Sequence, residues 1–103
     1  MQIEISYGDL EGSTALSTHV EDAVTKEIGH TANRVTRVEV HLRDDKQKRH
    51  GPNDRRCMME ARIAGEKPLA VEARGDDIYN VVTDAAGKLG RAVKHKLDKL
   101  REG

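Results

Sequence analysis

The chain contains no phenylalanine and no tryptophan, and its only large aromatic side chains are those of Tyr7 and Tyr79. A hydrophobic core must therefore be built from aliphatic side chains and methionine. Proteins that read single-stranded RNA on a sheet stack the bases on aromatic side chains, so this composition argues against that mode of recognition. A nucleic acid bound by this chain would have to be recognised by its shape and its phosphates.

Cysteine is equally scarce, since Cys57 is the only one. One cysteine can form neither an internal disulfide nor a thiolate metal site, and the five histidines lack the spacing of metal ligands. There is no Gly-x-Ser-x-Gly motif, and the acidic residues between Gly8 and Gly12 would repel phosphate. We therefore expect no enzyme, with no catalytic residues, no metal, no cofactor and no small-molecule substrate.

Long hydrophobic runs are also missing, and nothing resembles a signal peptide or a membrane span. A length of 103 residues suits one domain, so residues 1–103 are expected to form a single unit. These observations favour a cytoplasmic protein that does not associate with membranes. We expect a monomer rather than an obligate oligomer.

The formal net charge is zero, but the charged residues are unevenly distributed. Residues 1–33 contain six acidic and one basic side chain, and residues 63–84 contain five acidic and two basic. The balance is reversed in residues 34–62, with nine basic and five acidic, and in residues 85–103, with six basic and two acidic. The basic segments can contact phosphate while the acidic ones oppose indiscriminate binding, which favours a partner of defined shape.

Polar and apolar side chains alternate in four segments, which predicts four strands with one buried face each. These segments are residues 1–7, 35–43, 56–63 and 69–73. Residues 44–55 contain none of Ala, Val, Ile, Leu, Met, Cys, Phe, Tyr or Trp and include Gly51-Pro52-Asn53. This composition predicts a long hairpin loop between the two middle strands.

Two further segments repeat apolar residues at spacings of three and four, which predicts amphipathic helices. The first runs from Thr14 to Ile28, with Ser13 or Thr14 as its N-cap and Gly29 as its stop. The second runs from Asp76 to Arg101, with Asp76 or Asp77 as its cap. Its apolar stripe consists of Ile78, Val82, Ala85, Leu89, Val93 and Leu100.

The resulting order of elements is β-α-β-β-β-α, which predicts an α+β fold. Two amphipathic helices would cover one face of a four-stranded mixed sheet. The first two strands should be parallel through a right-handed crossover, and the hairpin connections make the other pairs antiparallel.

The second helix carries the best candidate for a binding surface. At 100° per residue, four basic side chains fall along one flank of the apolar stripe: Lys88, Arg91, His95 and Lys99. They could form a ridge that binds a polyanion, or a solvated helix end whose cations complement the helix dipole. Gly87 and Gly90 lie mid-helix, where glycine costs ~1 kcal/mol relative to alanine. They could let a phosphate backbone approach the ridge, or they could reflect a kink or simple tolerance.

The predicted sheet carries a second basic group. Its members are Arg37, His41, Arg43, Arg56 and Arg62, and they share the exposed face with Glu39, Glu60 and Glu72. This mixture favours cross-strand ion pairing on a solvated face.

Several features together resemble a known family. They are the order of elements, the opening Met-Gln-Ile-Glu-Ile, the segment Val35–Leu42, and Asp77-Ile78-Tyr79 leading to Lys88-Leu89. They resemble the ribosome hibernation promoting factors, also called ribosome-associated inhibitors or sigma-54 modulation proteins. The resemblance covers essentially the whole chain. It implies a dsRBD-like domain that docks on 16S rRNA of the small ribosomal subunit, in the mRNA and tRNA channel, and inactivates or stores ribosomes under stress or in stationary phase.

The resemblance also assigns roles to individual residues. Lys88, Arg91 and Lys94 match basic positions of the family's second helix that face ribosomal RNA, and Arg37 lies in the matching second strand. Together with the ridge, the expected RNA-binding residues are Lys88, Arg91, Lys94, His95, Lys99 and Arg37. The alternative is a protein-interaction module that modulates transcription or the stress response, suggested by the acidic first helix and the zero net charge.

Overall fold

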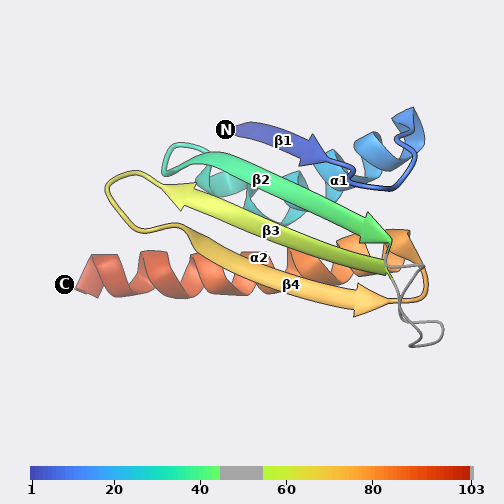
Figure 1. The fold of residues 1–103 in the computed structure, drawn as a ribbon. Helices are drawn as coiled ribbons and strands as arrows, with labels where there is room; N and C mark the ends of the chain where they lie inside the picture. Colours follow the sequence, from blue (N-terminus) through green and yellow to red (C-terminus); the bar gives the residue numbers. More distant parts are fainter. Residues whose placement is uncertain (45–54, 103) are drawn as a thin grey trace.

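The computed structural model describes residues 1–44 and 55–102. The elements follow in the order β1 (Gln2–Ser6), α1 (Thr14–Ile28), a short 3-10 helix η1 (Gly29–Thr31), β2 (Val35–Asp44), β3 (Arg55–Ile63), β4 (Leu69–Gly75) and α2 (Ile78–Glu102). Figure 1 shows this order along the chain. The predicted succession β-α-β-β-β-α is confirmed.

The four strands form one sheet in the order β1-β2-β3-β4. The pair β1–β2 is parallel, and the pairs β2–β3 and β3–β4 are antiparallel. Both helices lie against one face of the sheet, and the other face is left open (Figure 1). The predicted α+β architecture, with a mixed sheet covered on one side, is therefore confirmed.

The core lies between the sheet and the helices and is aliphatic. Val20 of α1, Val38 of β2, Met59 of β3 and Leu89 of α2 have no exposed surface. Every second residue is buried in this layer from Val38 to Asp44 of β2 and from Cys57 to Ile63 of β3, which is the period expected for strands with one buried face. The alternation seen in the sequence thus determines which face of the sheet the helices cover.

Helix α1 begins and ends at the predicted residues, Thr14 and Ile28. The Ser13 hydroxyl accepts a hydrogen bond from the backbone N–H of Leu16 at 3.1 Å, which satisfies a donor in the first turn. Gly29, the predicted stop, is the C-cap, and its backbone N–H donates to the carbonyl of Thr25. It has φ −57° and ψ −33° and leads directly into η1.

The two ends of the predicted hairpin loop belong to strands. Asp44 and Arg55 face each other in the β2–β3 register, and an Arg55 guanidinium nitrogen lies 3.8 Å from an Asp44 carboxylate oxygen. The Asp44 residue is only 3% exposed, and its backbone N–H donates to the Asp9 carboxylate at 3.0 Å. The prediction of a loop was therefore wrong for these two residues. Residues 45–54 lie outside the described part of the chain.

Helix α2 buries a wider face than the predicted stripe. Val81 and Ala86 are also buried, because α2 contacts α1 as well as the sheet. Gly90 faces α1, where an added Cβ would lie 2.8 Å from Oε1 and 3.2 Å from Cβ of Glu27. Gly90 therefore permits close helix packing, and the expectation that it opens a path for phosphate is wrong. Gly87 is more open: an added Cβ would have one neighbour within 4 Å, a guanidinium nitrogen of Arg91 at 3.5 Å.

The two glycines should respond oppositely to the same substitution. Gly90→Leu is expected to lower the free energy of unfolding by about 1–3 kcal/mol, because the side chain would overpack the contact with Glu27. Gly87→Leu should leave it unchanged or raise it by up to about 1 kcal/mol through better helix propensity. Urea denaturation of both variants measures the difference. Equal effects at the two positions would contradict the assignment of Gly90 to the interface between the helices.

Candidate RNA interface

Four basic side chains of α2 form one exposed flank, which we call the α2 ridge: Lys88, Arg91, His95 and Lys99. Within the described part of the chain, none of the four is in an ion pair. The Lys88 ammonium donates to the backbone carbonyl of Glu72 on β4 at 2.9 Å. The ridge therefore begins at the edge strand of the sheet and continues along α2, where, beside the hydrogen bond from Lys94, His95 contributes to lowering the pKa of the Asp98 carboxyl.

The remaining basic residues of α2 lie close to carboxylates. Lys94 lies 3.0 Å from an Asp98 carboxylate oxygen, and Arg101 contacts the other oxygen of Asp98 at 3.6 Å. Lys96 reaches Glu66 at 3.0 Å. The hydrogen bond from Lys94 lowers the pKa of Asp98, with further contributions from the nearby positive charges. These carboxylates hold the three cations within the protein's own charge network.

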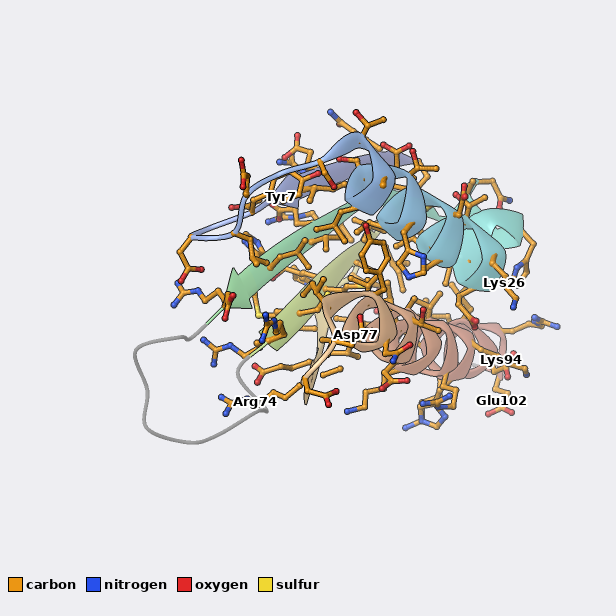
Figure 2. The ribbon with its side chains drawn as sticks, turned by 90° about the vertical axis from the view of Figure 1, so that its right-hand side faces the viewer. Tyr7, Lys26, Arg74, Asp77, Lys94 and Glu102 are labelled. Carbon is orange, nitrogen blue, oxygen red and sulfur yellow. The ribbon has the colours of Figure 1, made fainter. Side chains whose placement is uncertain are left out.

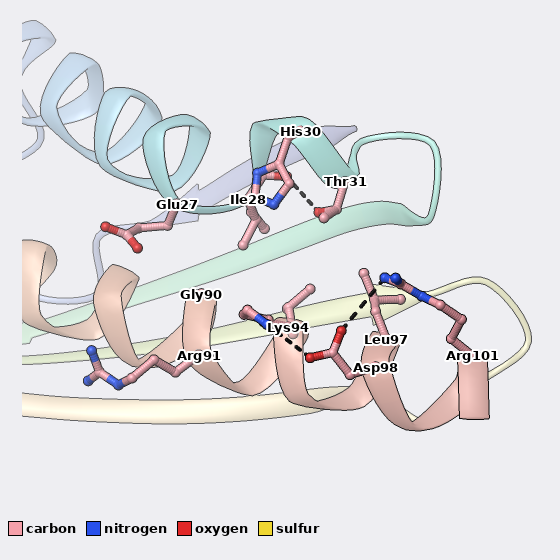
Figure 3. Close-up of a pocket in the computed structure, with 11 residues that line it drawn as sticks. Glu27, Ile28, His30, Thr31, Gly90, Arg91, Lys94, Leu97, Asp98 and Arg101 are labelled. Atoms are coloured by element: carbon pink, nitrogen blue, oxygen red, sulfur yellow. Dashed lines mark hydrogen bonds and ion pairs between the residues drawn. The ribbon is translucent and has the colours of Figure 1, made fainter. Parts of the chain in front are cut away.

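Lys94 does not lie on the α2 ridge. Six residues separate it from Lys88, which places it about 120° away around the helix. It lines a groove of about 380 Å³ between α2 and the end of α1. Figure 3 shows Lys94 and Arg101 on either side of Asp98, and Arg91 farther along the helix. The apolar floor of this groove is formed by Ile28, Val93 and Leu97. Of the expected RNA-binding set, Lys94 is paired with a carboxylate, and Arg91 lines the same groove.

Arg37 lies on the open face of the sheet, on the side away from the helices. Its guanidinium contacts the Glu4 carboxylate and lies 3.5 Å from that of Glu39. Arg62, its neighbour in the register, lies 3.7 Å from Glu39 and 3.5 Å from Glu60. The cross-strand pairing predicted for this face is confirmed here. The six expected residues therefore do not form one surface, and Arg37 is separated from the ridge by the sheet itself.

The structure offers no support for nucleophilic or metal chemistry. Cys57 is fully buried, and burial raises the pKa of its thiol to about 12, so the thiolate is not accessible near neutral pH. In residues 1–44 and 55–102, no group of three or more His, Cys, Asp or Glu side chains is placed to hold a metal ion. None of the helices in this part of the chain is long and apolar enough to cross a membrane.

Comparison with protein families gives one match that spans nearly the whole chain. Residues 3–101 match the family described as sigma 54 modulation protein / S30EA ribosomal protein. No curated protein sequence matches significantly.

Solved structures share the fold. A ribosomal subunit interface protein from Coxiella burnetii superposes with a TM-score of 0.77 at 19% identity, covering 94% of this chain and 99% of that one. The N-terminal domain of Protein Y from Thermus thermophilus gives a TM-score of 0.67 at 19% identity, covering 91% and 93%. At this level of identity, the likeness concerns the fold alone.

The buried thiol predicts a specific pH dependence. Because the pKa of Cys57 is raised from 9.0 to about 12 in the folded state, its contribution to stability is complete below pH 9.0 and is lost as pH rises toward about 12. The free energy of unfolding should fall more steeply over this range in the parent than in Cys57→Ala. Urea denaturation across the alkaline range measures both curves. Parallel curves would show that Cys57 ionises equally in the folded and unfolded states.

Proposed function

This chain belongs to the sigma-54 modulation protein / S30EA ribosomal protein family, and on that premise we propose that it is a cytoplasmic, non-enzymatic ribosome-binding regulator of translation. In this proposal a monomer docks on 16S rRNA of the small subunit and inactivates or stores ribosomes under stress or in stationary phase. The family match and the fold shared with a ribosomal subunit interface protein support it.

The observation that carries the proposal is the selective exposure of the α2 ridge. The net charge of the chain is zero, so no overall attraction draws it to RNA. On the same helix, Lys94, Lys96 and Arg101 each form an ion pair with a carboxylate. The four ridge residues form no ion pair with any carboxylate of the described residues. From Lys88 to Lys99 the ridge extends about 16 Å at 1.5 Å per residue, long enough to contact several phosphates of one RNA strand.

The mechanism is occlusion rather than chemistry. The ridge would bind phosphates and thereby orient the domain, because phosphate contacts fix position without reading sequence. The body of the domain, which measures 46 × 26 × 18 Å, would then obstruct the path of mRNA and tRNA. A complex held by such contacts loses counterions on formation, so its affinity should fall steeply as salt increases.

Two variants with equal charge changes test this proposal. The ridge variant is Lys88→Gln/Arg91→Gln/Lys99→Gln, and the control is Lys26→Gln/Lys96→Gln/Arg101→Gln. Cosedimentation with small ribosomal subunits should be lost in the ridge variant, by about tenfold or more in affinity, and largely kept in the control. Circular dichroism verifies that both variants remain folded.

Other results would overturn the proposal in distinguishable ways. Equal losses in both variants would show that net charge alone governs binding, and the ridge would have no special role. Unchanged cosedimentation of the ridge variant would exclude the ridge as the contact surface. A parent protein that retains a specific protein partner but no ribosomal subunit at physiological salt would instead support a protein-interaction module.

A further inference from the structure

The open face of the sheet is arranged in rows of side chains that run across the strands. Strand register places Arg43 of β2 opposite Arg56 of β3, and Arg56 opposite Arg74 of β4. We call these three residues the arginine row. The row lies where β2 and β4 end, and Figure 2 views the molecule from that end, with Arg74 on the open side of the sheet.

The arginine row has far less compensating charge than the other arginines of this face. Arg37 and Arg62 adjoin a row of three glutamates, Glu4, Glu39 and Glu60, and form ion pairs with them. Among the described residues, the arginine row forms ion pairs with one carboxylate, that of Glu72, which lies 3.2 Å from Arg74 and 3.9 Å from Arg56.

No carboxylate in the described part of the chain is in an ion pair with Arg43. Glu39, in the glutamate row, lies four residues along β2 from Arg43, about 14 Å at 3.4 Å per residue. This exceeds the screening length of about 8 Å at physiological salt, so the glutamates do not neutralise the row.

Such an arrangement is unfavourable for folding by itself. Like charges directly opposite one another on neighbouring strands destabilise a sheet. Three guanidinium groups in line, with one carboxylate between them, therefore bring a cost that an anionic ligand would relieve. Guanidinium groups bind phosphate through two parallel hydrogen bonds, which suits them to this role.

A hollow of about 350 Å³ lies beside the row. It is lined by Ser6, Gly8, His41, Leu42, Arg43, Arg56, Met58 and Glu72. Gly8 has φ +60°, and a Cβ there would lie 2.8 Å from the carbonyl oxygen of Leu42 and 3.7 Å from Cγ of Arg43. Glycine is thus required by the backbone, and it also leaves space next to the first arginine of the row.

The row meets the α2 ridge at one residue of the edge strand. The Glu72 carboxylate contacts Arg56 and Arg74 on the open face, and its backbone carbonyl accepts from Lys88 at the start of the ridge. Basic side chains therefore continue from the open face, around the edge of β4, onto the outer flank of α2. The two groups form one track rather than two isolated patches.

We propose that the arginine row binds the phosphate backbone of a structured RNA that crosses the strands and continues around β4 onto the α2 ridge. The row of glutamates would repel a polyanion running along the strands, so the RNA is confined to this end of the sheet. No Phe, Tyr or Trp side chain lies on the strands of the open face, so we expect contacts to phosphates rather than to a platform of stacked bases. The assignment of this RNA as ribosomal rests on the proposed function, and the phosphate site does not.

Two further triple variants test the row. The row variant is Arg43→Gln/Arg56→Gln/Arg74→Gln, and its control with the same charge change is Lys26→Gln/Arg34→Gln/Lys67→Gln, at three exposed positions away from the row. Binding is measured over a range of salt to an RNA duplex of about 16 base pairs, to small ribosomal subunits, and to poly-glutamate. The row variant should bind both RNA targets about tenfold more weakly, with a log–log salt slope shallower by about 2 to 3, and the control should resemble the parent. The Tm of the row variant should equal or exceed that of the parent, because the substitutions remove like charges that face one another across the strands.

Other outcomes of these binding measurements have distinct meanings. A row variant that binds RNA like the parent, with an unchanged salt slope, overturns the inference even if the ridge variant fails to bind. Loss of poly-glutamate binding without loss of RNA binding reassigns the row to an acidic protein and also overturns it. If the parent binds the duplex through the row but not the small subunit, the phosphate site stands and the ribosomal proposal falls. A parent that binds neither RNA overturns both.

Discussion

The structure depends on the burial of an aliphatic core against a single face of the sheet. Without phenylalanine or tryptophan, the layer between sheet and helices is filled by valine, leucine, isoleucine and methionine. Small residues at the contact between the helices, Ala86 and Gly90 in particular, allow α1 and α2 to approach closely over it. Because the core uses only one face, the opposite face of the sheet and the outer flank of α2 remain exposed and carry the charged residues.

The distribution of ion pairs gives a neutral protein a defined basic surface. Carboxylates compensate Lys94, Lys96 and Arg101 on one side of α2, and Arg37 and Arg62 at one end of the open face. In residues 1–44 and 55–102, the α2 ridge forms no ion pair with a carboxylate, and the arginine row forms ion pairs with Glu72 alone. Such selective compensation favours a partner whose phosphates follow this path, and it disfavours general binding to polyanions.

Local periodicity was sufficient to predict the elements and the order in which they occur. The alternation in the strands and the spacing of three and four in the helices are properties of neighbouring residues, and they also placed the α2 ridge on one flank. The arginine row required the register between strands, which depends on an irregularity between Val35 and Arg37 and on the β3–β4 pairing. No pattern among the residues near Arg74 in the sequence indicated that it would join Arg43 and Arg56. The roles of Gly90 and Lys94 depend on the packing of α1 against α2, which the helical period alone does not determine.

In the proposed complex, RNA phosphates follow the basic track from the arginine row around β4 to the α2 ridge. An electron cryomicroscopy structure of the protein bound to the small ribosomal subunit tests it most directly. We expect 16S rRNA phosphates within hydrogen-bond distance of Arg43, Arg56 and Arg74, and of the ridge residues Lys88 and Arg91. Arg37 should remain paired with Glu4. A complex in which both the row and the ridge face solvent would contradict it.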